Sequence, residues 1–178
     1  ISLLPKEVNV LPIQDNFKIF SQSLLSSALT FLSKGKFNLA FYRICFAILN
    51  RIEKNPAICE QKSWKYVKYF HHTISKEYDA AIGYLEKTST YFVRDKVISK
   101  NKIAWIHTDL EMAKLDLKRE HQNLQYFNHI VTVSVNLVEK LQKVFPGLES
   151  KIISIENIIS KRALVNLANE KISLPYSK

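Results

Sequence analysis

The sequence predicts an α/β protein with a doubly wound, mainly parallel, Rossmann-like sheet covered by helices. Three observations support this prediction. Short apolar runs alternate with amphipathic helical segments in the second half of the chain. These runs lack clean apolar–polar alternation, which is typical of strands that are buried on both faces. Strand–helix repeats at this spacing form right-handed βαβ units, which build one parallel sheet.

The first half of the chain reads as mostly helical. Residues 7–13 (EVNVLPI) alternate in polarity and predict a short strand that ends at Pro12. Apolar residues at helical spacing then predict three helices, over residues 17–33, 37–54 and 58–75.

The apolar run at residues 37–49 is shorter than the ~20 residues of a membrane-spanning helix. Arg43 also interrupts it. We expect a core helix that packs against the sheet. The alternative is a basic, aromatic segment, residues 34–54, that lies in the plane of a membrane interface.

The second half predicts four strand–helix pairs. The expected strands are residues 78–85, 102–107, 129–134 and 151–155. The expected helices are residues 89–99, a helix within residues 112–127, and residues 136–145 and 161–170. No internal boundary stands out, so residues 1–169 are predicted to form one domain and residues 170–178 a linker.

The composition is that of a basic globular protein. The 178 residues include 26 Lys and Arg against 16 Asp and Glu, which gives a net charge of +10. This charge favours anionic partners, such as nucleic acid, acidic lipid head groups or phosphorylated substrates. The two cysteines can form neither a disulfide scaffold nor, by themselves, a structural zinc site, and this fits a cytoplasmic location. The chain begins with Ile, so we expect it to be part of a longer polypeptide.

Polar residues follow the predicted strands, where open parallel sheets bind their ligands. His107 in WIHTD can donate a hydrogen bond to a sugar hydroxyl or a phosphate, or carry a proton. Glu86 in GYLEKTST can bind sugar hydroxyls, and Thr88 opens the next helix. The structural alternatives are a helix capped by Thr88 and its neighbours, and a strand end at which Asp109 caps the following helix.

Two further strand ends carry weaker signals. Ser134 in VTVSVN reads first as a helix cap, although the helix N-terminus that it opens could hold a phosphate. Asn157 follows the last predicted strand.

Common cofactor and metal signatures are missing from the sequence. There is no GxGxxG, HExxH, CxxC or GxSxG motif. Adjacent His71 and His72 point to different faces of a helix and cannot easily share a metal ion. RNA binding would be indicated by a basic stripe or by aromatic residues on an exposed sheet face. The sequence shows neither, so no nucleic-acid partner is predicted.

Residues 78–160 carry an ordered series of motifs: YDAAIGYLEKTSTYFV, then KIAWIHTDLE, then FNHIVTVSVNLVEKLQKVFPGLESKIISIENIIS. In order and spacing this series resembles the N-terminal domain of bacterial family-four glycosyltransferases, which have the two-domain glycosyltransferase-B fold. The resemblance covers about half of the chain.

The resemblance implies transfer of a sugar from a nucleotide-diphosphate donor to an acceptor, with retention of configuration and without a metal or cofactor. His107 would lie near the donor sugar. Glu86, Thr88, Thr108 and Asp109 would line the acceptor side, with Ser134 and Asn157 on the donor side of the cleft. The acceptor would be a glycan, expected to be lipid-linked, of cell-envelope or capsular polysaccharide synthesis, at the inner face of the membrane.

The sequence departs from the family pattern in three places. The family's first strand and glycine-rich turn are missing, and so is the C-terminal donor-binding domain. Ile158 stands where the family usually has a glycine. We therefore expect this chain alone to be inactive. The alternatives are a non-catalytic basic α/β interaction module and, less favoured, a nucleotide-sugar epimerase; an anionic membrane surface is a further candidate partner.

Overall fold

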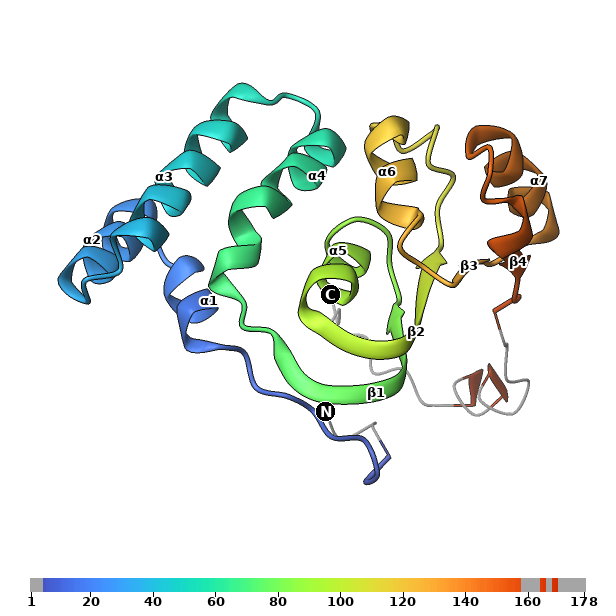
Figure 1. Cartoon of the computed structure of the whole chain (residues 1–178), viewed down its shortest axis with the longest axis horizontal. Helices are drawn as coiled ribbons and strands as arrows, with labels where there is room; N and C mark the ends of the chain where they lie inside the picture. The colour runs from blue at the N-terminus through green and yellow to red at the C-terminus, as the bar shows by residue number, and fades with distance from the viewer. Residues whose placement is uncertain (1–4, 158–163, 166–167, 170–178) are drawn as a thin grey trace, which may run out of the picture.

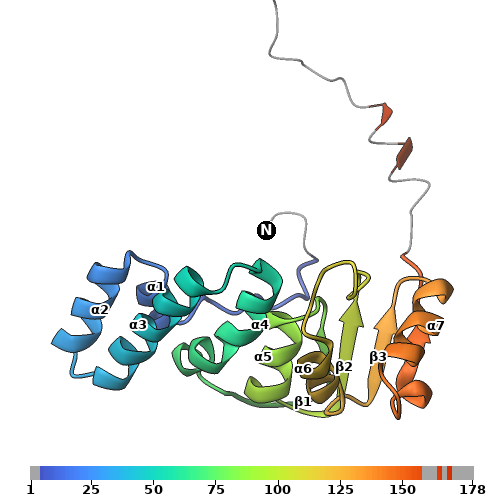
Figure 2. The same cartoon turned by 90° about the horizontal axis from the view of Figure 1, so that it is seen from above.

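The computed structural model describes residues 5–157, 164–165 and 168–169. The molecule is elongated, with a helical part at one end and a parallel sheet at the other (Figure 1, Figure 2). The helical part comprises α1 (Asp15–Phe20), α2 (Leu24–Ser33), α3 (Phe37–Ile52) and α4 (Pro56–Val67), followed by a 3-10 turn (Lys68–Phe70).

Polar caps and one glycine set the limits of these helices. The Ser23 hydroxyl accepts a hydrogen bond from the amide of Ser26 at 3.3 Å and begins α2. Gly35, with a φ of +67°, ends this helix in a conformation that side chains disfavour. Asn55 caps α4 by accepting from the amide of Ala57 at 2.9 Å.

Aromatic side chains fill the core of the helical part. Phe20, Phe31 and Phe70 are buried against one another, with ring centroids 4.6 Å (Phe20–Phe70) and 5.4 Å (Phe31–Phe70) apart. Trp64 of α4 and Tyr91 of α5 (Thr88–Lys96) belong to the same cluster. The helical part therefore packs directly on α5, which lies over the sheet.

The sheet consists of four parallel strands in sequential order. They are β1 (Ile74–Gly83), β2 (Val97–Ile106), β3 (His129–Thr132) and β4 (Ile152–Ser154). Helices α5, α6 (Leu117–Leu124) and α7 (Val135–Val144) form the crossovers between neighbouring strands. The predicted α/β class, with a parallel Rossmann-like sheet flanked by helices, is confirmed.

One face of the sheet packs on these helices. Ala81, Ala104, Ile130 and Ile152 contribute one side chain from each strand to a core that is completed by the helices. The side chains that alternate with them include Ile82 and Ile153, which are exposed. Burial on both faces, expected from the apolar runs, therefore does not occur at these two positions, although Val131 of β3, on the same face as Ile153, is buried.

The strand order explains the exposed face. A doubly wound sheet reverses its winding direction at a central strand, whereas the four described strands progress in one direction. Right-handed crossovers between sequential strands place all the connecting helices on the same side. The described sheet thus has the winding of one half of a doubly wound sheet.

Several details of the first half differ from the prediction. The predicted helix over residues 58–75 ends at Val67, with a 3-10 turn to Phe70, and α3, expected to pack against the sheet, packs mainly on α2 and α4. Residues 7–13 form no strand, and their apolar side chains are exposed. The predicted helix over residues 17–33 is two helices, separated at residues 21–23. The predicted helix over residues 161–170 and the linker over residues 170–178 fall wholly or largely outside the described residues.

A buried polar network joins the helices over the sheet. The carboxylate of Glu120 in α6 accepts from the Tyr91 hydroxyl at 2.7 Å and from Gln61 Nε2 at 3.1 Å. Burial raises the pKa of Glu120 above its ordinary value, and the hydrogen bonds that its carboxylate accepts offset only part of this effect. Gln61 also bonds the backbone of Asp116, so α4 fixes the start of α6.

Candidate functional site

The residues that follow the strands gather at one edge of the sheet. Because all four strands are parallel, their carboxyl ends lie at the same edge. The register pairs Gly83 with Ala104 in β1 and β2, and Ile106 with Thr132 in β2 and β3. The loops that carry the predicted site residues are therefore neighbours.

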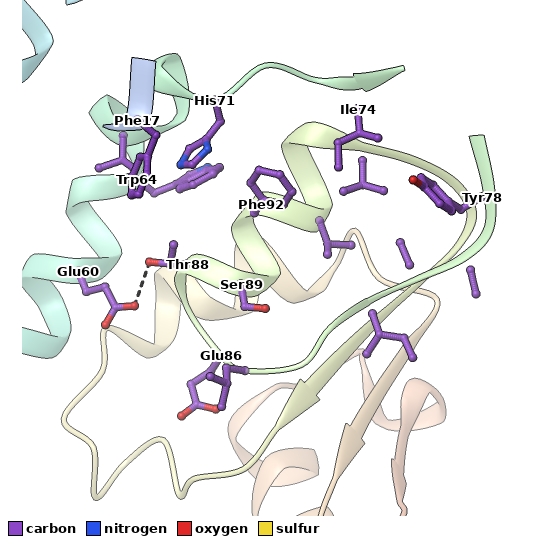
Figure 3. Close-up of a pocket in the computed structure, with 17 residues that line it drawn as sticks. Phe17, Glu60, Trp64, His71, Ile74, Tyr78, Glu86, Thr88, Ser89 and Phe92 are labelled. Carbon is purple, nitrogen blue, oxygen red and sulfur yellow. Dashed lines mark hydrogen bonds between the residues drawn. The ribbon is translucent and has the colours of Figure 1, made fainter. Parts of the chain in front are cut away.

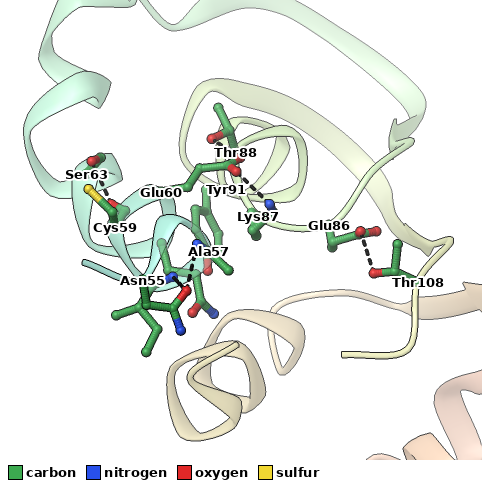
Figure 4. Close-up of polar contacts among 12 residues, drawn as sticks. Asn55, Ala57, Cys59, Glu60, Ser63, Glu86, Lys87, Thr88, Tyr91 and Thr108 are labelled. Carbon is green, nitrogen blue, oxygen red and sulfur yellow. Dashed lines mark hydrogen bonds and ion pairs between the residues drawn. The ribbon is translucent and has the colours of Figure 1, made fainter. Parts of the chain in front are cut away.

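Glu86 joins the first two of these loops (Figure 4). Its side chain is buried, with only 9% of its surface exposed. Oε1 accepts a hydrogen bond from the Thr108 hydroxyl at 2.7 Å, and Oε2 accepts from the backbone amide of His107 at 3.3 Å. The carboxylate thus fixes the end of β2 to the turn after β1.

The turn that carries Glu86 is held from its other side by Glu60 of α4 (Figure 4). Glu60 accepts from the Thr88 hydroxyl at 2.9 Å and pairs with the Lys87 ammonium group at 2.6 Å. Lys87 has a φ of +64°, which is uncommon for a residue with a side chain. Strained backbone of this kind persists where surrounding contacts determine it, as Glu60 and Glu86 do here.

His107 belongs to an aromatic cluster on the same edge. Its ring centroid lies 4.8 Å from that of Tyr84 and 6.4 Å from that of Trp105. His107 Nε2 and Trp105 Nε1 are buried, and neither has a hydrogen-bond partner in the described structure. Buried polar atoms are normally paired, so these two nitrogens, together with the equally unpaired Thr132 Oγ1 at the end of β3, are candidates for contacts with a ligand.

Both carboxylate oxygens of Asp109 are bonded to other groups of the protein. Its Oδ1 accepts from the amides of Glu111 at 3.1 Å and Met112 at 3.3 Å, and its Oδ2 pairs with Lys140 of α7 at 2.8 Å. The Lys140 ammonium group holds the pKa of Asp109 below its ordinary value, with the Met112 amide as the next contribution. These contacts cap the turn after the strand, so the alternative in which Asp109 caps the following helix is wrong. The helix that follows starts later and is capped by Asp116.

The two donor-side candidates lie on the later loops. Ser134 caps α7, because its hydroxyl accepts from the amide of Leu137 at 3.3 Å. Asn157 is exposed beyond β4. The structure therefore joins Glu86, His107 and Thr108 by hydrogen bonds, and places Ser134 and Asn157 on separate loops of the same edge.

A groove of about 730 Å³ reaches Glu86 from the helical part (Figure 3). It runs between α4, α5 and β1, and most of its wall is apolar, including Trp64, Phe92 and Ile82. Glu86 and Thr88 line one end. An apolar groove with a few polar groups at one end is a common form of ligand site.

His71 lies in the wall of this groove among aromatic rings (Figure 3). Its ring stacks on Phe17, with centroids 4.5 Å apart, and meets Phe92 edge-on at 5.4 Å. Burial lowers the pKa of His71, and the nearby charge of Lys96 lowers it further. His71 is thus a packed, neutral histidine. Among the described residues, no group of three or more His, Cys, Asp or Glu side chains could hold a metal ion.

Sequence reasoning missed the supporting residues of the site. Glu60 lies 26 residues before Glu86 in an ordinary amphipathic helix, and no local pattern distinguishes it. Trp105 and Tyr84 were visible as neighbours of the predicted residues. Their contact, with centroids 5.3 Å apart, depends on the pairing of β1 with β2.

Comparisons of the chain with protein-family models, with curated proteins and with solved structures found no match. The fold and the site therefore define the chain only as a parallel α/β protein with a polar strand-end site beside an apolar groove. None of the helices in the described residues has both the length and the apolarity that a bilayer crossing needs.

Proposed function

We propose that this chain is the acceptor-side half of a glycosyltransferase that moves a sugar from a nucleotide-diphosphate donor to a glycan acceptor. The proposal starts from the motif series that resembles bacterial family-four glycosyltransferases. The observation that supports it best is the bonding of Glu86 to Thr108 and to the His107 amide. This contact unites the two motifs, GYLE and WIHTD, that the proposed cleft requires together.

His107 is the proposed catalytic residue. Its unpaired Nε2 and its place beyond β2 suit a hydrogen bond to a hydroxyl of the transferred sugar. Glu86 then acts as a positioning residue, since both of its oxygens hold the His107–Thr108 loop. Asp109 and Lys140 fix the far end of that loop.

The groove supports an acceptor with an apolar part. Its wall of Trp64, Phe92 and Ile82 suits a hydrocarbon chain, whereas Glu86 and Thr88 at its end suit hydroxyl groups. A lipid-linked glycan of envelope or capsular polysaccharide synthesis combines both parts. We propose this class of acceptor, handled at the inner face of the membrane.

Departure of the nucleoside diphosphate needs cationic groups and helix N-termini around its charge. We propose that a second, donor-binding domain supplies them, as the family resemblance implies, and that residues 1–178 alone are inactive. We further propose that transfer retains the anomeric configuration and needs no metal ion.

The test is a screen of nucleotide sugars with the complete natural gene product, in the presence of EDTA. We expect turnover of one donor, and an anomeric configuration in the product that matches that of the donor. His107→Ala should lower kcat/KM roughly tenfold or more, which is about 1.4 kcal/mol in the barrier. The control is His129→Ala, an exposed histidine that starts β3 at the opposite edge of the sheet.

Three results would argue against the proposal. Equal kinetics for His107→Ala and the wild type would remove His107 from the site. Turnover by residues 1–178 alone would contradict the need for a donor domain. A complete gene product that uses none of the nucleotide sugars would favour a non-catalytic interaction module.

A further inference from the structure

The hairpin of α2 and α3 exposes a continuous apolar stripe. On α3 the exposed residues recur at helical spacing on one side of the helix. They are Phe37, Phe41, Ile44, Ile48 and Ile52. Phe37 is 68% exposed and Ile52 is 72% exposed, so the stripe is open along the whole helix. Leu25, Leu29 and Leu32 of α2 are exposed as well.

The stripe is not the face by which α3 packs on the protein. The opposite side of the helix buries Leu39 and Arg43 against α1, α2 and α4. Arg43 donates hydrogen bonds to the carbonyl oxygens of Phe20 at 3.2 Å and Gln22 at 3.1 Å, which fixes the rotation of α3. The helix is therefore apolar on two faces, and the fold uses only one of them. An exposed apolar surface of this extent marks an interaction site.

The exposed charges at the two ends of the stripe are basic, and the acidic residue that follows α3, Glu53, pairs with Lys62 at 2.6 Å. Residues 21–52 contain no Asp or Glu. Lys34 lies exposed beside the turn of the hairpin, and Arg51 and Lys54 lie exposed at its other end. Such a surface, apolar along its length and basic at its ends, matches an anionic lipid bilayer, in which hydrocarbon lies beneath a layer of negative head groups.

The position of the hairpin suits contact with a large flat surface. In both views α2 and α3 form the end of the elongated molecule that is farthest from α7 (Figure 1, Figure 2). A bilayer can therefore reach the hairpin without meeting the sheet. The strand-end site and its groove lie away from this end.

We propose that the α2–α3 hairpin docks this protein on an anionic membrane surface, with the α3 stripe in the head-group region. A second copy of this chain is a poorer occupant, because each copy carries a net charge of +10 and the same cations would meet. This inference does not depend on the proposed transferase activity. It assigns the membrane contact to the exposed stripe of α3. The sequence had instead favoured this helix as part of the core.

The test is co-sedimentation of the full chain with phosphatidylcholine vesicles that contain either no or 30% phosphatidylglycerol. We expect binding to the anionic vesicles at 50 mM salt, and at least tenfold weaker binding to neutral vesicles or at 500 mM salt. The triple variant Phe37→Ser, Phe41→Ser, Ile48→Ser should lower the partition coefficient at least tenfold. The triple variant Lys34→Gln, Arg51→Gln, Lys54→Gln should also lower it at least tenfold.

A matched control removes exposed apolar side chains from the other end of the molecule. Ile98→Ser with Ile153→Ser alters exposed positions of β2 and β4, outside the groove, and should leave the partition coefficient within twofold of the wild type. Near-UV circular dichroism of each variant checks that the fold is retained. All the substituted residues are exposed, which favours folding.

Several outcomes would overturn the proposal. One is the absence of binding to anionic vesicles at 50 mM salt. Another is equal binding by the folded apolar variant and the wild type. Analytical ultracentrifugation could instead reveal a dimer that the three serine substitutions dissociate, which would assign the stripe to self-association. A stable complex with an acidic protein that blocks the stripe, without vesicle binding, would assign it to a protein partner.

Discussion

Oε1 of Glu86 accepts a hydrogen bond from the Thr108 hydroxyl at 2.7 Å, so the turn after β1 and the loop after β2 are fixed to each other. The carboxylate is buried and has both oxygens bonded to the protein. Removing the hydrogen-bond donors of a buried carboxylate costs stability. Removing the carboxylate costs stability too, because its donors then lose their acceptor. Glu86 therefore controls the geometry of the site through its neighbours.

The first prediction concerns substitution of Glu86. Glu86→Ala should lower the free energy of unfolding by about 1–3 kcal/mol, because the His107 amide and the Thr108 hydroxyl lose their acceptor. Glu86→Gln should have a smaller effect, since an amide can accept from His107 and donate to Thr108. Urea denaturation measures both.

Glu77→Gln is the matched control, because this glutamate lies exposed on β1. It should change the free energy of unfolding by less than about 0.5 kcal/mol. Equal stabilities of the Glu86→Ala and Glu77→Gln variants would show that the Glu86 contacts do not fix the two loops.

The residues of this site could be predicted from the sequence, whereas the contacts between them could not. Glu86, His107 and Thr108 were found because each follows an apolar run, and parallel strands bring such residues to one edge. The bond between Glu86 and Thr108 depends on the register that pairs Gly83 with Ala104, which no local pattern encodes. For the same reason Lys140, 31 residues after Asp109, could not be predicted as its partner.

The second prediction is a pH dependence of stability from His71. Its pKa is lowered in the folded protein, whereas the unfolded chain titrates near 6.5. Above about pH 6.5 both states are neutral at this residue. As the pH falls below that value, the unfolded state binds a proton before the folded state does, so the free energy of unfolding decreases. His71→Phe should remove this part of the decrease.

The measurement is urea denaturation of the wild type and of His71→Phe between pH 5 and pH 8. The difference between their free energies of unfolding should shift in favour of the variant as the pH falls. His129→Phe, at an exposed position, controls for the substitution itself. A difference that is constant with pH would contradict a neutral, buried His71.

The third prediction concerns Arg43, the buried cation of the helical part. It donates to two backbone carbonyls and lies 5.0 Å from the ring centroid of Phe20. Arg43→Met retains the aliphatic volume but leaves these carbonyls without donors. Thermal and urea denaturation should show a loss of about 2 kcal/mol.

Arg51→Met, an exposed position on the same helix, is the control and should be nearly neutral. If both variants lost the same stability, the Arg43 hydrogen bonds would not be what fixes α3.

The fold was predictable where local signals were strong. Capping residues and periodic apolar positions predicted α7 over nearly its full length, because Ser134 marks its start and Pro146 follows its end. Residues 7–13 were predicted as a strand from alternation alone, yet a strand needs a partner edge, and none of the described strands pairs with them. At the break at residues 21–23, Ser23 caps α2 and Arg43 binds the carbonyl of Gln22, so a local cap and a tertiary contact coincide there.

The last prediction tests how α5 is seated on β1. A Cβ atom at Gly83 would lie 2.8 Å from the Cα atom and 3.1 Å from the amide nitrogen of Thr90, which are backbone atoms of α5. Gly83→Ala should therefore push the helix away and lower the free energy of unfolding by about 1–3 kcal/mol. Thr90→Ala should not rescue it, because the closest contact is with backbone. A stabilising effect, as Gly→Ala gives where space allows, would contradict this close approach. Because α5 begins at Thr88, directly after the turn that carries Glu86, the same substitution should also disturb the candidate site.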